Sequence, residues 1–394
     1  MSDLSITRDA LVRGQSQLPV ASYFDAALFE REREALFRNR PRYVGHALAV
    51  PEVGDYHVLS QEGDGRALVR HAGGVELVSN VCRHRQAVIL RGRGASQGHI
   101  VCPLHRWTYD LTGQLIGAPH FAQDPCLNLT RYALQQWNGL LFERPQAADG
   151  VEQPAAGRAG PREADGNDVA TDLAALGAHA DLDFSGYVYD RTYLHECAYN
   201  WKTFIEVYLE DYHVGPFHPG LGNFVSCDDL RWQMGRDFSV QTVGVAHSGG
   251  EALGRAGSPV YRQWQDAVLR YQRGTPPRHG AVWLTYYPGV MVESYPNVLV
   301  VSTLIAQSPR KTLNVVEFFY PEEIAAFERD YVQAQQAAYL ETCIEDDEIA
   351  LRMDAGRQAL MERGDDDAGP YQSPMEDGMQ HFHEWYRRRL QMPL

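Results

Sequence analysis

The sequence is poor in cysteine, in positive charge and in long apolar runs. Six cysteines in 394 residues are too few for a disulfide-stapled secreted scaffold, so we expect a reducing, cytoplasmic environment. No stretch approaches the eighteen apolar residues of a membrane span, and residues 1–17 lack the apolar core of a secretory signal. Acidic residues outnumber basic ones by 51 to 36, and the net charge of −15 argues against binding to nucleic acid or to an anionic membrane.

Two of the six cysteines belong to short motifs with histidine. Cys82 and His84 form C-x-H, and Cys102 and His105 form C-x-x-H after seventeen intervening residues. Each pair alone is expected roughly 0.2 times by chance at this composition, but both in this order only about once in a thousand such chains. Two such pairs on facing loops can hold a two-iron cluster, with the cysteines on one iron and the histidines on the other. A Cys2His2 zinc site has the same ligands, but zinc fingers usually pair like with like, so the mixed pairs favour the cluster.

The remaining four cysteines stand outside these motifs. We expect them to be small buried apolar residues and not ligands. They are Cys126, Cys197, Cys227 and Cys343.

The segment from Val81 to Asp110 resembles the Rieske domain of the ring-hydroxylating and demethylating non-haem iron oxygenases, in their catalytic (alpha) subunit. The resemblance rests on C-P-L-H at residues 102–105, followed by Trp, Tyr and Asp at 107, 109 and 110. That family usually has glycine after the H-R of the first loop and after the second histidine, because glycine permits close backbone approach. This chain has Gln86 and Arg106 there. We expect both to affect the potential or the docking surface of the cluster while removing no ligand.

A second histidine motif begins at Glu210 and reads E-D-Y-H-V-G-P-F-H-P. The spacing H-x-x-x-x-H is expected roughly 0.6 times by chance, so the spacing alone carries no weight. Residues 199–213 are predicted to form an amphipathic helix with His213 at its end. Its apolar stripe is predicted to consist of Trp201, Phe204, Ile205, Tyr208 and Tyr212. Gly215 and Pro216 are predicted to break the helix and to turn His218 back onto the same centre. By the resemblance, His213 and His218 bind a mononuclear iron(II).

The third iron ligand is expected from the acidic run at residues 345–348 on a late helix, leaving coordination sites open for O2. In the family, the ligand aspartate is followed ten residues later by glycine, and Gly356 stands ten residues after Asp346. Asp346 is therefore the predicted ligand. Asp347 is the alternative, because the acidic doublet leaves the register ambiguous.

Glu210 is predicted to support the iron and not to bind it. It lies three residues before His213, which would place it one helical turn back on the same face. In the family, an acidic residue here bonds an iron-ligating histidine and reaches a cluster histidine of a neighbouring subunit. A carboxylate in that position orients the imidazole and raises its basicity.

The order of expected elements predicts an α+β protein with four segments. Residues 1–42 are predicted as a helical segment packing on the catalytic domain, 43–145 as an all-β Rieske [2Fe-2S] domain, 146–180 as an Ala/Gly/Pro/Asp-rich linker or insert, and 181–394 as the catalytic mononuclear iron domain. Strands between 281 and 320 precede a long helix from Pro321 to about Arg363 and a short final helix. The resemblance implies a helix-grip (START-like) catalytic domain with an antiparallel sheet.

The resemblance implies the terminal oxygenase of a multicomponent system. An NAD(P)H-dependent reductase, with or without a ferredoxin, would supply electrons to the cluster. The iron and O2 would then hydroxylate, dihydroxylate or oxidatively demethylate a small substrate, which we expect to be aromatic. The family also implies a homotrimer in which His105 of one chain connects through Glu210 to His213 of the next.

Three alternatives remain open. One is a monooxygenase of a quaternary ammonium compound of the carnitine or betaine type. Aromatic residues near the expected pocket could cage such a cation, or could equally be core residues of the sheet: Trp283, Tyr286, Tyr287 and Tyr295. The others are a non-catalytic Rieske electron carrier and a zinc-stabilised binding module.

Overall fold

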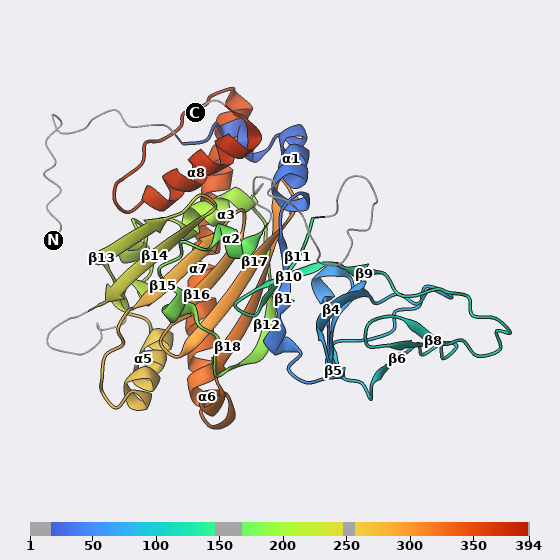
Figure 1. The fold of residues 1–394 in the computed structure, drawn as a ribbon. Helices are drawn as coiled ribbons and strands as arrows, with labels where there is room; N and C mark the ends of the chain where they lie inside the picture. The colour runs from blue at the N-terminus through green and yellow to red at the C-terminus, as the bar shows by residue number, and fades with distance from the viewer. Residues whose placement is uncertain (1–16, 146–167, 247–256, 393–394) are drawn as a thin grey trace, which may run out of the picture.

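The computed structural model describes residues 17–145, 168–246 and 257–392. Figure 1 shows a larger body, built on one broad sheet with helices around it, and a smaller β body beside it. The observed architecture is therefore α+β, as the sequence predicts. Within the described ranges, no helix is both long and apolar enough to cross a bilayer.

The larger body is organised around a seven-stranded antiparallel sheet in the order β12-β18-β17-β16-β15-β14-β13. Its strands are β12 (Tyr187–Cys197), β13 (Val225–Met234), β14 (Phe238–Val245), β15 (Ala281–Tyr286), β16 (Val290–Tyr295), β17 (Val298–Ser308) and β18 (Lys311–Pro321). Every residue of β15 is buried, so both faces of the sheet are covered. Because side chains alternate along a strand, Ala281 and Trp283 join one core cluster while Val282 and Leu284 join another.

Two helices cover the face on which Trp283 lies. They are α5 (Pro259–Tyr271) and α7 (Arg329–Arg363), and α7 is preceded by α6 (Glu322–Phe327). The sequence predicts one helix from Pro321 to Arg363, but the chain is interrupted at Glu328, which has φ −119° and ψ 54°. Gly364, with φ +77°, ends α7 in the left-handed conformation that glycine adopts without a steric cost.

A separate cluster joins the N-terminal segment to the end of the chain. It packs α1 (Ala26–Glu32) and the π-helical turn Arg33–Arg38 against α3 (Trp201–Tyr208) and α8 (Asp377–Leu390). Asp25 caps α1 by accepting a hydrogen bond from the Leu28 N–H at 2.7 Å. A fully buried ion pair between Lys202 and Glu32, 2.7 Å long, ties α3 to α1.

The smaller body contains a five-stranded sheet and a three-stranded sheet, in the orders β5-β2-β3-β4-β9 and β6-β7-β8. The strands are β2 (Asp55–Val58), β3 (Arg66–His71), β4 (Gly74–Ser79), β5 (Arg93–Ala95), β6 (His99–Val101), β7 (Thr108–Asp110), β8 (Leu115–Gly117) and β9 (Arg131–Tyr132). A third sheet joins the two bodies, in the order β1-β11-β10, with β1 (Arg42–His46), β10 (Leu134–Trp137) and β11 (Leu140–Glu143). Tyr43 and Phe142 of this sheet pack against the large one.

The segment predicted as a linker or insert falls partly outside the described residues, since 146–167 are not described. Its end is ordered and forms α2 (Val169–Asp172). Val169, Leu173 and Leu176 are buried against the large sheet, so residues 168–180 contribute to the core.

Two candidate metal centres and a buried pocket

Cys82 and Cys102 lie on two loops that repeat one local structure. The Gln86 N–H donates to the Cys82 carbonyl at 3.0 Å, and the Arg106 N–H donates to the Cys102 carbonyl at 3.1 Å. Gln86 and Arg106 have positive φ angles of 53° and 62°, respectively. These are the positions where the family usually has glycine, so both loops keep the glycine-type backbone although neither has the glycine.

The four predicted cluster ligands converge at the ends of these loops. Both cysteines are 1% exposed, and the rings of His84 and His105 are 4.7 Å apart between centroids. His84 Nδ1 is buried and has no hydrogen-bond partner among the described residues, although its ring stacks on Trp107 at 4.9 Å. A buried ring nitrogen without a partner is costly unless it binds a metal. Two buried thiols beside two imidazoles, one of them with an orphaned nitrogen, fit a [2Fe-2S] cluster.

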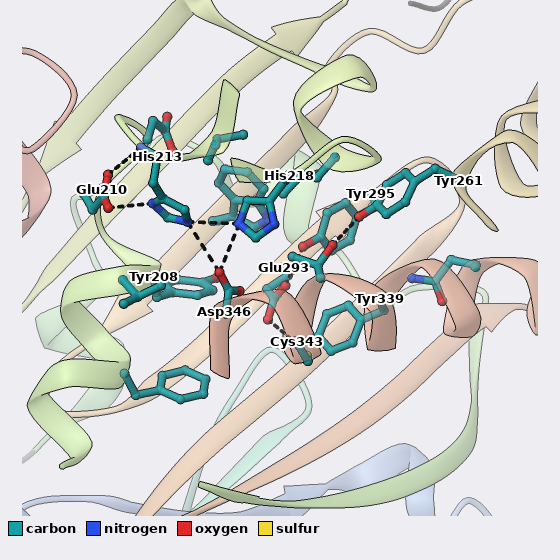
Figure 2. A pocket seen from close by; sticks show the side chains of 18 of the residues that line it. Tyr208, Glu210, His213, His218, Tyr261, Glu293, Tyr295, Tyr339, Cys343 and Asp346 are labelled. Atoms are coloured by element: carbon teal, nitrogen blue, oxygen red, sulfur yellow. Dashed lines mark hydrogen bonds and ion pairs between the residues drawn. The ribbon is translucent and has the colours of Figure 1, made fainter. Parts of the chain in front are cut away.

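The structure also brings together His213, His218 and Asp346 (Figure 2). The two Nε2 atoms are 3.0 Å apart, and Asp346 Oδ1 lies 3.4 Å from His213 Nε2 and 3.0 Å from His218 Nε2. Ligands bound at about 2.1 Å and at right angles to one another are separated by about 3 Å. The three atoms therefore fit one face of an octahedral metal site, the arrangement of a 2-His-1-carboxylate triad.

Carboxylates hold the outer nitrogen of each histidine. His213 Nδ1 donates to Glu210 at 2.6 Å, and His218 Nδ1 donates to Glu345 at 2.7 Å. Each bond fixes the tautomer that leaves Nε2 free to bind a metal. Burial opposes the charge of Asp346, but the two histidines outweigh it and lower the pKa of this carboxyl, as suits an anionic ligand.

Asp347 points to different partners. It accepts hydrogen bonds from His195 Nε2 and from the Tyr199 hydroxyl, each at 2.7 Å. Successive residues of a helix project about 100° apart, so the two aspartates of the doublet face different sides of α7. His195, Cys197 and Asp347 are close enough together to form a second group of potential metal ligands.

The local structure around Glu210 differs from the prediction. Helix α3 ends at Tyr208, so Glu210 lies in the following turn, where it also accepts from the His213 N–H at 3.0 Å. Tyr212 was predicted on the apolar stripe but is 60% exposed for the same reason. Gly215 and Pro216 lie inside a short helix, α4 (Val214–Phe217), because proline is compatible with the first turn of a helix. This turn of helix, and not a break, places His218.

A pocket lies next to the His213, His218 and Asp346 side chains (Figure 2). Its wall contains seven phenylalanine, tyrosine and tryptophan side chains, among them Trp283 and Tyr295, two of the four aromatics singled out in the sequence. The other two lie elsewhere: Tyr286 donates to Asp172 and Tyr287 donates to Ser239. Two further carboxylates, Asp211 and Glu293, also line the pocket. On a continuous helix Asp211 would be offset by about 100° from Glu210 and is predicted to point elsewhere, but the helix ends at Tyr208 and both side chains line the same pocket.

The prediction that the other cysteines are buried holds fully only for Cys197. Cys126 is exposed, because it lies in the loop between β8 and β9 and not in a strand. Cys227 and Cys343 are partly buried.

Comparisons with known proteins find related proteins for both bodies of the chain. Residues 184–392 match the family described as ring hydroxylating alpha subunit (catalytic domain), and residues 41–137 match the Rieske [2Fe-2S] domain. The chain is 63% identical over 388 residues to a putrescine 2-hydroxylase of Ralstonia nicotianae, covering 98% of this chain and 99% of that protein. It is 57% identical over 392 residues to a putrescine 2-hydroxylase of Bordetella bronchiseptica, covering 96% and 85%. A carnitine monooxygenase oxygenase subunit of Escherichia coli K12 is 29% identical over 232 residues, covering 57% and 58%.

Solved structures share the fold. A quaternary ammonium Rieske monooxygenase in complex with L-carnitine superposes with a TM-score of 0.70 at 18% identity, covering 95% of this chain and 96% of that one. Naphthalene 1,2-dioxygenase from Rhodococcus sp. superposes with a TM-score of 0.63 at 18% identity, covering 95% and 94%. The family implies a [2Fe-2S] cluster and a mononuclear iron as cofactors, and the residues described above fit both. The chain therefore belongs to the Rieske non-haem iron oxygenases, as the catalytic alpha subunit, and is an oxidoreductase.

Proposed function

We propose that this oxygenase hydroxylates an aliphatic diamine, putrescine, at carbon 2. The observation that carries the proposal is the 63% identity, over nearly the whole of both chains, to a protein named putrescine 2-hydroxylase. From the sequence we expect a small aromatic substrate, and this relative favours an aliphatic amine in its place. Membership in an enzyme family argues against the electron carrier and the zinc-stabilised binding module.

The charge of the pocket supports a cationic substrate. Among the described residues that line it there are four carboxylates, Glu210, Asp211, Glu293 and Asp346, and neither a lysine nor an arginine. Two of the four are engaged with the histidines, and the other two remain available to a positive ligand. An aromatic hydrocarbon would leave these buried charges uncompensated.

We assign the metal ligands as the geometry favours. Cys82, His84, Cys102 and His105 would hold the cluster, and His213, His218 and Asp346 the iron. When bound, these groups supply electron transfer and the activation of O2, so that a C–H bond becomes C–OH with two electrons and two protons, and the second oxygen atom leaves as water. Glu210 and Glu345 hold the Nδ1 protons of the two histidines, and the buried aromatic wall excludes bulk water from the reacting carbon.

We propose that electrons come from a partner reductase that uses NAD(P)H, directly or through a ferredoxin, and that the oxygenase is a homotrimer. The smaller body projects from one side of the larger one, with β6 and β8 on its side away from the large sheet (Figure 1). That arrangement suits a ring in which the cluster of one chain approaches the iron of the next. Glu210 would then connect His213 to His105 of the partner subunit.

The test is a reconstituted reaction. The purified oxygenase, loaded with both metals, is combined with a reductase, NADH, O2 and putrescine. The expected product is heavier than putrescine by one oxygen atom, with the hydroxyl placed at carbon 2 by NMR. Parallel reactions with naphthalene and indole are expected to give no coupled O2 consumption. Turnover of an aromatic substrate but not of putrescine would overturn the proposal.

A second candidate is the oxidation of a quaternary ammonium compound. It is favoured by the aromatic wall of the pocket, since ring faces attract such cations, and by the identity to the carnitine monooxygenase subunit. Carnitine and choline are therefore included in the same assay. Release of trimethylamine or formaldehyde from either, without hydroxylation of putrescine, would establish this candidate in place of the first.

A further inference from the structure

Glu293 is a buried carboxylate without a positive partner. It lies on β16, is 1% exposed, and forms no ion pair with a lysine or arginine within the described ranges. The hydroxyls of Tyr295 and Tyr339 donate to it at 2.8 and 3.0 Å, and that of Ser302 at 3.5 Å. These donors do not offset the burial, which raises the pKa of Glu293 to about 7. A carboxylate that is costly to bury and also faces a pocket is a candidate for ligand binding.

The surroundings of Glu293 suit an ammonium group. The rings of Trp283 and Tyr295 are 6.1 Å apart between centroids, and those of Tyr295 and Tyr339 are 6.4 Å apart. Figure 2 shows Tyr295 and Tyr339 beside the Glu293 carboxylate, on the same side of the pocket as Asp346. An ammonium group placed here would meet a negative charge, the hydroxyl groups of two tyrosines and a surrounding of aromatic side chains.

Asp211 is a second such carboxylate in the same pocket. It is 3% exposed, and only one of its side-chain oxygens has a partner, the side-chain amide of Gln241. The other oxygen, Oδ2, is buried without a hydrogen-bond partner among the described residues. The Tyr208 hydroxyl is likewise buried without a partner, and the charges of both Glu293 and Asp211 raise its pKa beyond the effect of burial. Tyr208 therefore lies in the field of both carboxylates.

We propose, resting on the diamine function above, that Glu293 and Asp211 are the substrate-binding carboxylates and that each binds one ammonium group of the diamine. A dication compensates both buried charges, whereas a monoamine leaves one of them without a partner and a diol leaves both. An ammonium group also donates hydrogen bonds to a carboxylate, which a trimethylammonium group cannot do. The two carboxylates would thus select a diamine over a monoamine and over carnitine or choline.

The test compares a dication with a monocation of the same length. Putrescine and 1-aminobutane are titrated into the metal-loaded enzyme without O2, and their dissociation constants are measured by calorimetry. Loss of one partner of a buried charge pair costs enough to weaken binding about 30-fold or more. The wild type should therefore prefer putrescine by at least that factor. In Glu293→Gln and in Asp211→Asn the preference should fall towards one, because the second ammonium group has lost its partner.

Glu317→Gln is the matched control. Glu317 is also a buried carboxylate on the large sheet, 4% exposed, and burial raises its pKa to about 7 as well. It is bonded by the Tyr43 hydroxyl and does not line the pocket. Its replacement should leave the preference for putrescine within about threefold of the wild type. Iron content and the cluster spectrum of every variant report on folding.

The outcomes separate the two proposals. If the wild type neither binds nor hydroxylates putrescine, the diamine function falls, and the assignment of the carboxylates falls with it. If the wild type binds putrescine but Glu293→Gln and Asp211→Asn keep its preference, the assignment is wrong while the function stands.

Should Glu293→Gln fail to hold iron, Glu293→Asp and Asp211→Asn carry the comparison. Loss of the preference in Asp211→Asn, with retention in Glu293→Asp, supports the assignment, and an unchanged preference in Asp211→Asn overturns it.

Discussion

At the scale of single residues, Asp346 and Asp347 are adjacent in sequence and have different partners in space. Asp346 turns to His213 and His218, while Asp347 is held by His195 and Tyr199. A one-residue change of register on α7 would therefore replace a side chain in the iron site by one that lies outside it.

This contrast predicts different results for two isosteric changes. Asp346→Asn should lose the mononuclear iron. Replacing a residue that only supports a metal ligand lowers metal affinity by roughly 10–100-fold, and replacing the ligand itself should lower it further. Asp347→Asn should keep the iron. Iron analysis should thus give about two irons per chain for the first variant and about three for the second, with an unchanged cluster spectrum in both. Retained iron in Asp346→Asn, together with loss in Asp347→Asn, would move the ligand by one residue.

The sequence indicates only some of the residues at this site. His213, His218 and Asp346 stand out because metal ligands need particular residue types at particular spacings. In the sequence, Glu345 is only one member of the acidic run at residues 345–348, and its bond to His218 depends on how α7 packs. Glu293 has no signal in the sequence, and helical spacing wrongly predicts that Asp211 points away from the site. Their importance comes from burial without a counter-charge, which is a property of the folded pocket.

At the scale of elements, the strands and helices of the larger body follow the predicted patterns, and the differences lie where they join. The interruption at Glu328 between α6 and α7 has no glycine or proline to announce it. Gly215 and Pro216 gave a misleading signal in the other direction, since the chain makes a helical turn through them. Local sequence predicts regular structure well, but tertiary packing decides where adjacent elements meet.

The two cluster loops give a prediction at this scale. In the folded protein, the left-handed conformation costs a residue other than glycine about 1–2 kcal/mol. Glycine instead lowers stability by about 0.4–1 kcal/mol, because it gives the unfolded chain more conformational freedom. Gln86→Gly and Arg106→Gly should therefore each stabilise the cluster-loaded protein by about 0–1.6 kcal/mol. Denaturant unfolding followed by the cluster absorbance measures this change.

Gln97→Gly serves as the control for these loops. Gln97 is exposed, close in the chain, and not among the residues with positive φ, so glycine there should destabilise the protein. A lower midpoint for Gln86→Gly or Arg106→Gly would mean that contacts of the original side chains outweigh the strain of their backbone.

At the scale of the whole molecule, the two candidate metal centres lie in different bodies of one chain. The cluster loops belong to the smaller body, whereas Asp346 of the candidate iron site lies on α7 of the larger body (Figure 1). In the proposed ring, the cluster of one subunit would lie beside the iron of the next. Electrons would then pass between subunits and not from one body to the other within a chain. Such an interface is heterologous, because the surface that donates electrons differs from the surface that accepts them.

This arrangement predicts that two inactive variants restore activity when mixed. His213→Ala should keep its cluster but lose the iron, and His105→Ala should keep the iron but lose its cluster. Co-expression with two affinity tags gives mixed rings, in which some interfaces pair an intact cluster with an intact iron site. Product formation should return in the doubly tagged fraction, whereas each parent ring should remain inactive.

Glu210→Gln tests the connection itself. Glu210 bonds both the ring and the backbone N–H of His213, so the neutral amide should keep the ring in place while losing the charge that favours electron transfer. Both metals should remain bound, and single-turnover oxidation of the reduced cluster should slow by about 10-fold or more.

Verified mixed rings without activity above either parent would place electron transfer within one chain. Rapid cluster oxidation in Glu210→Gln would instead leave the ring intact and show that another residue makes the connection.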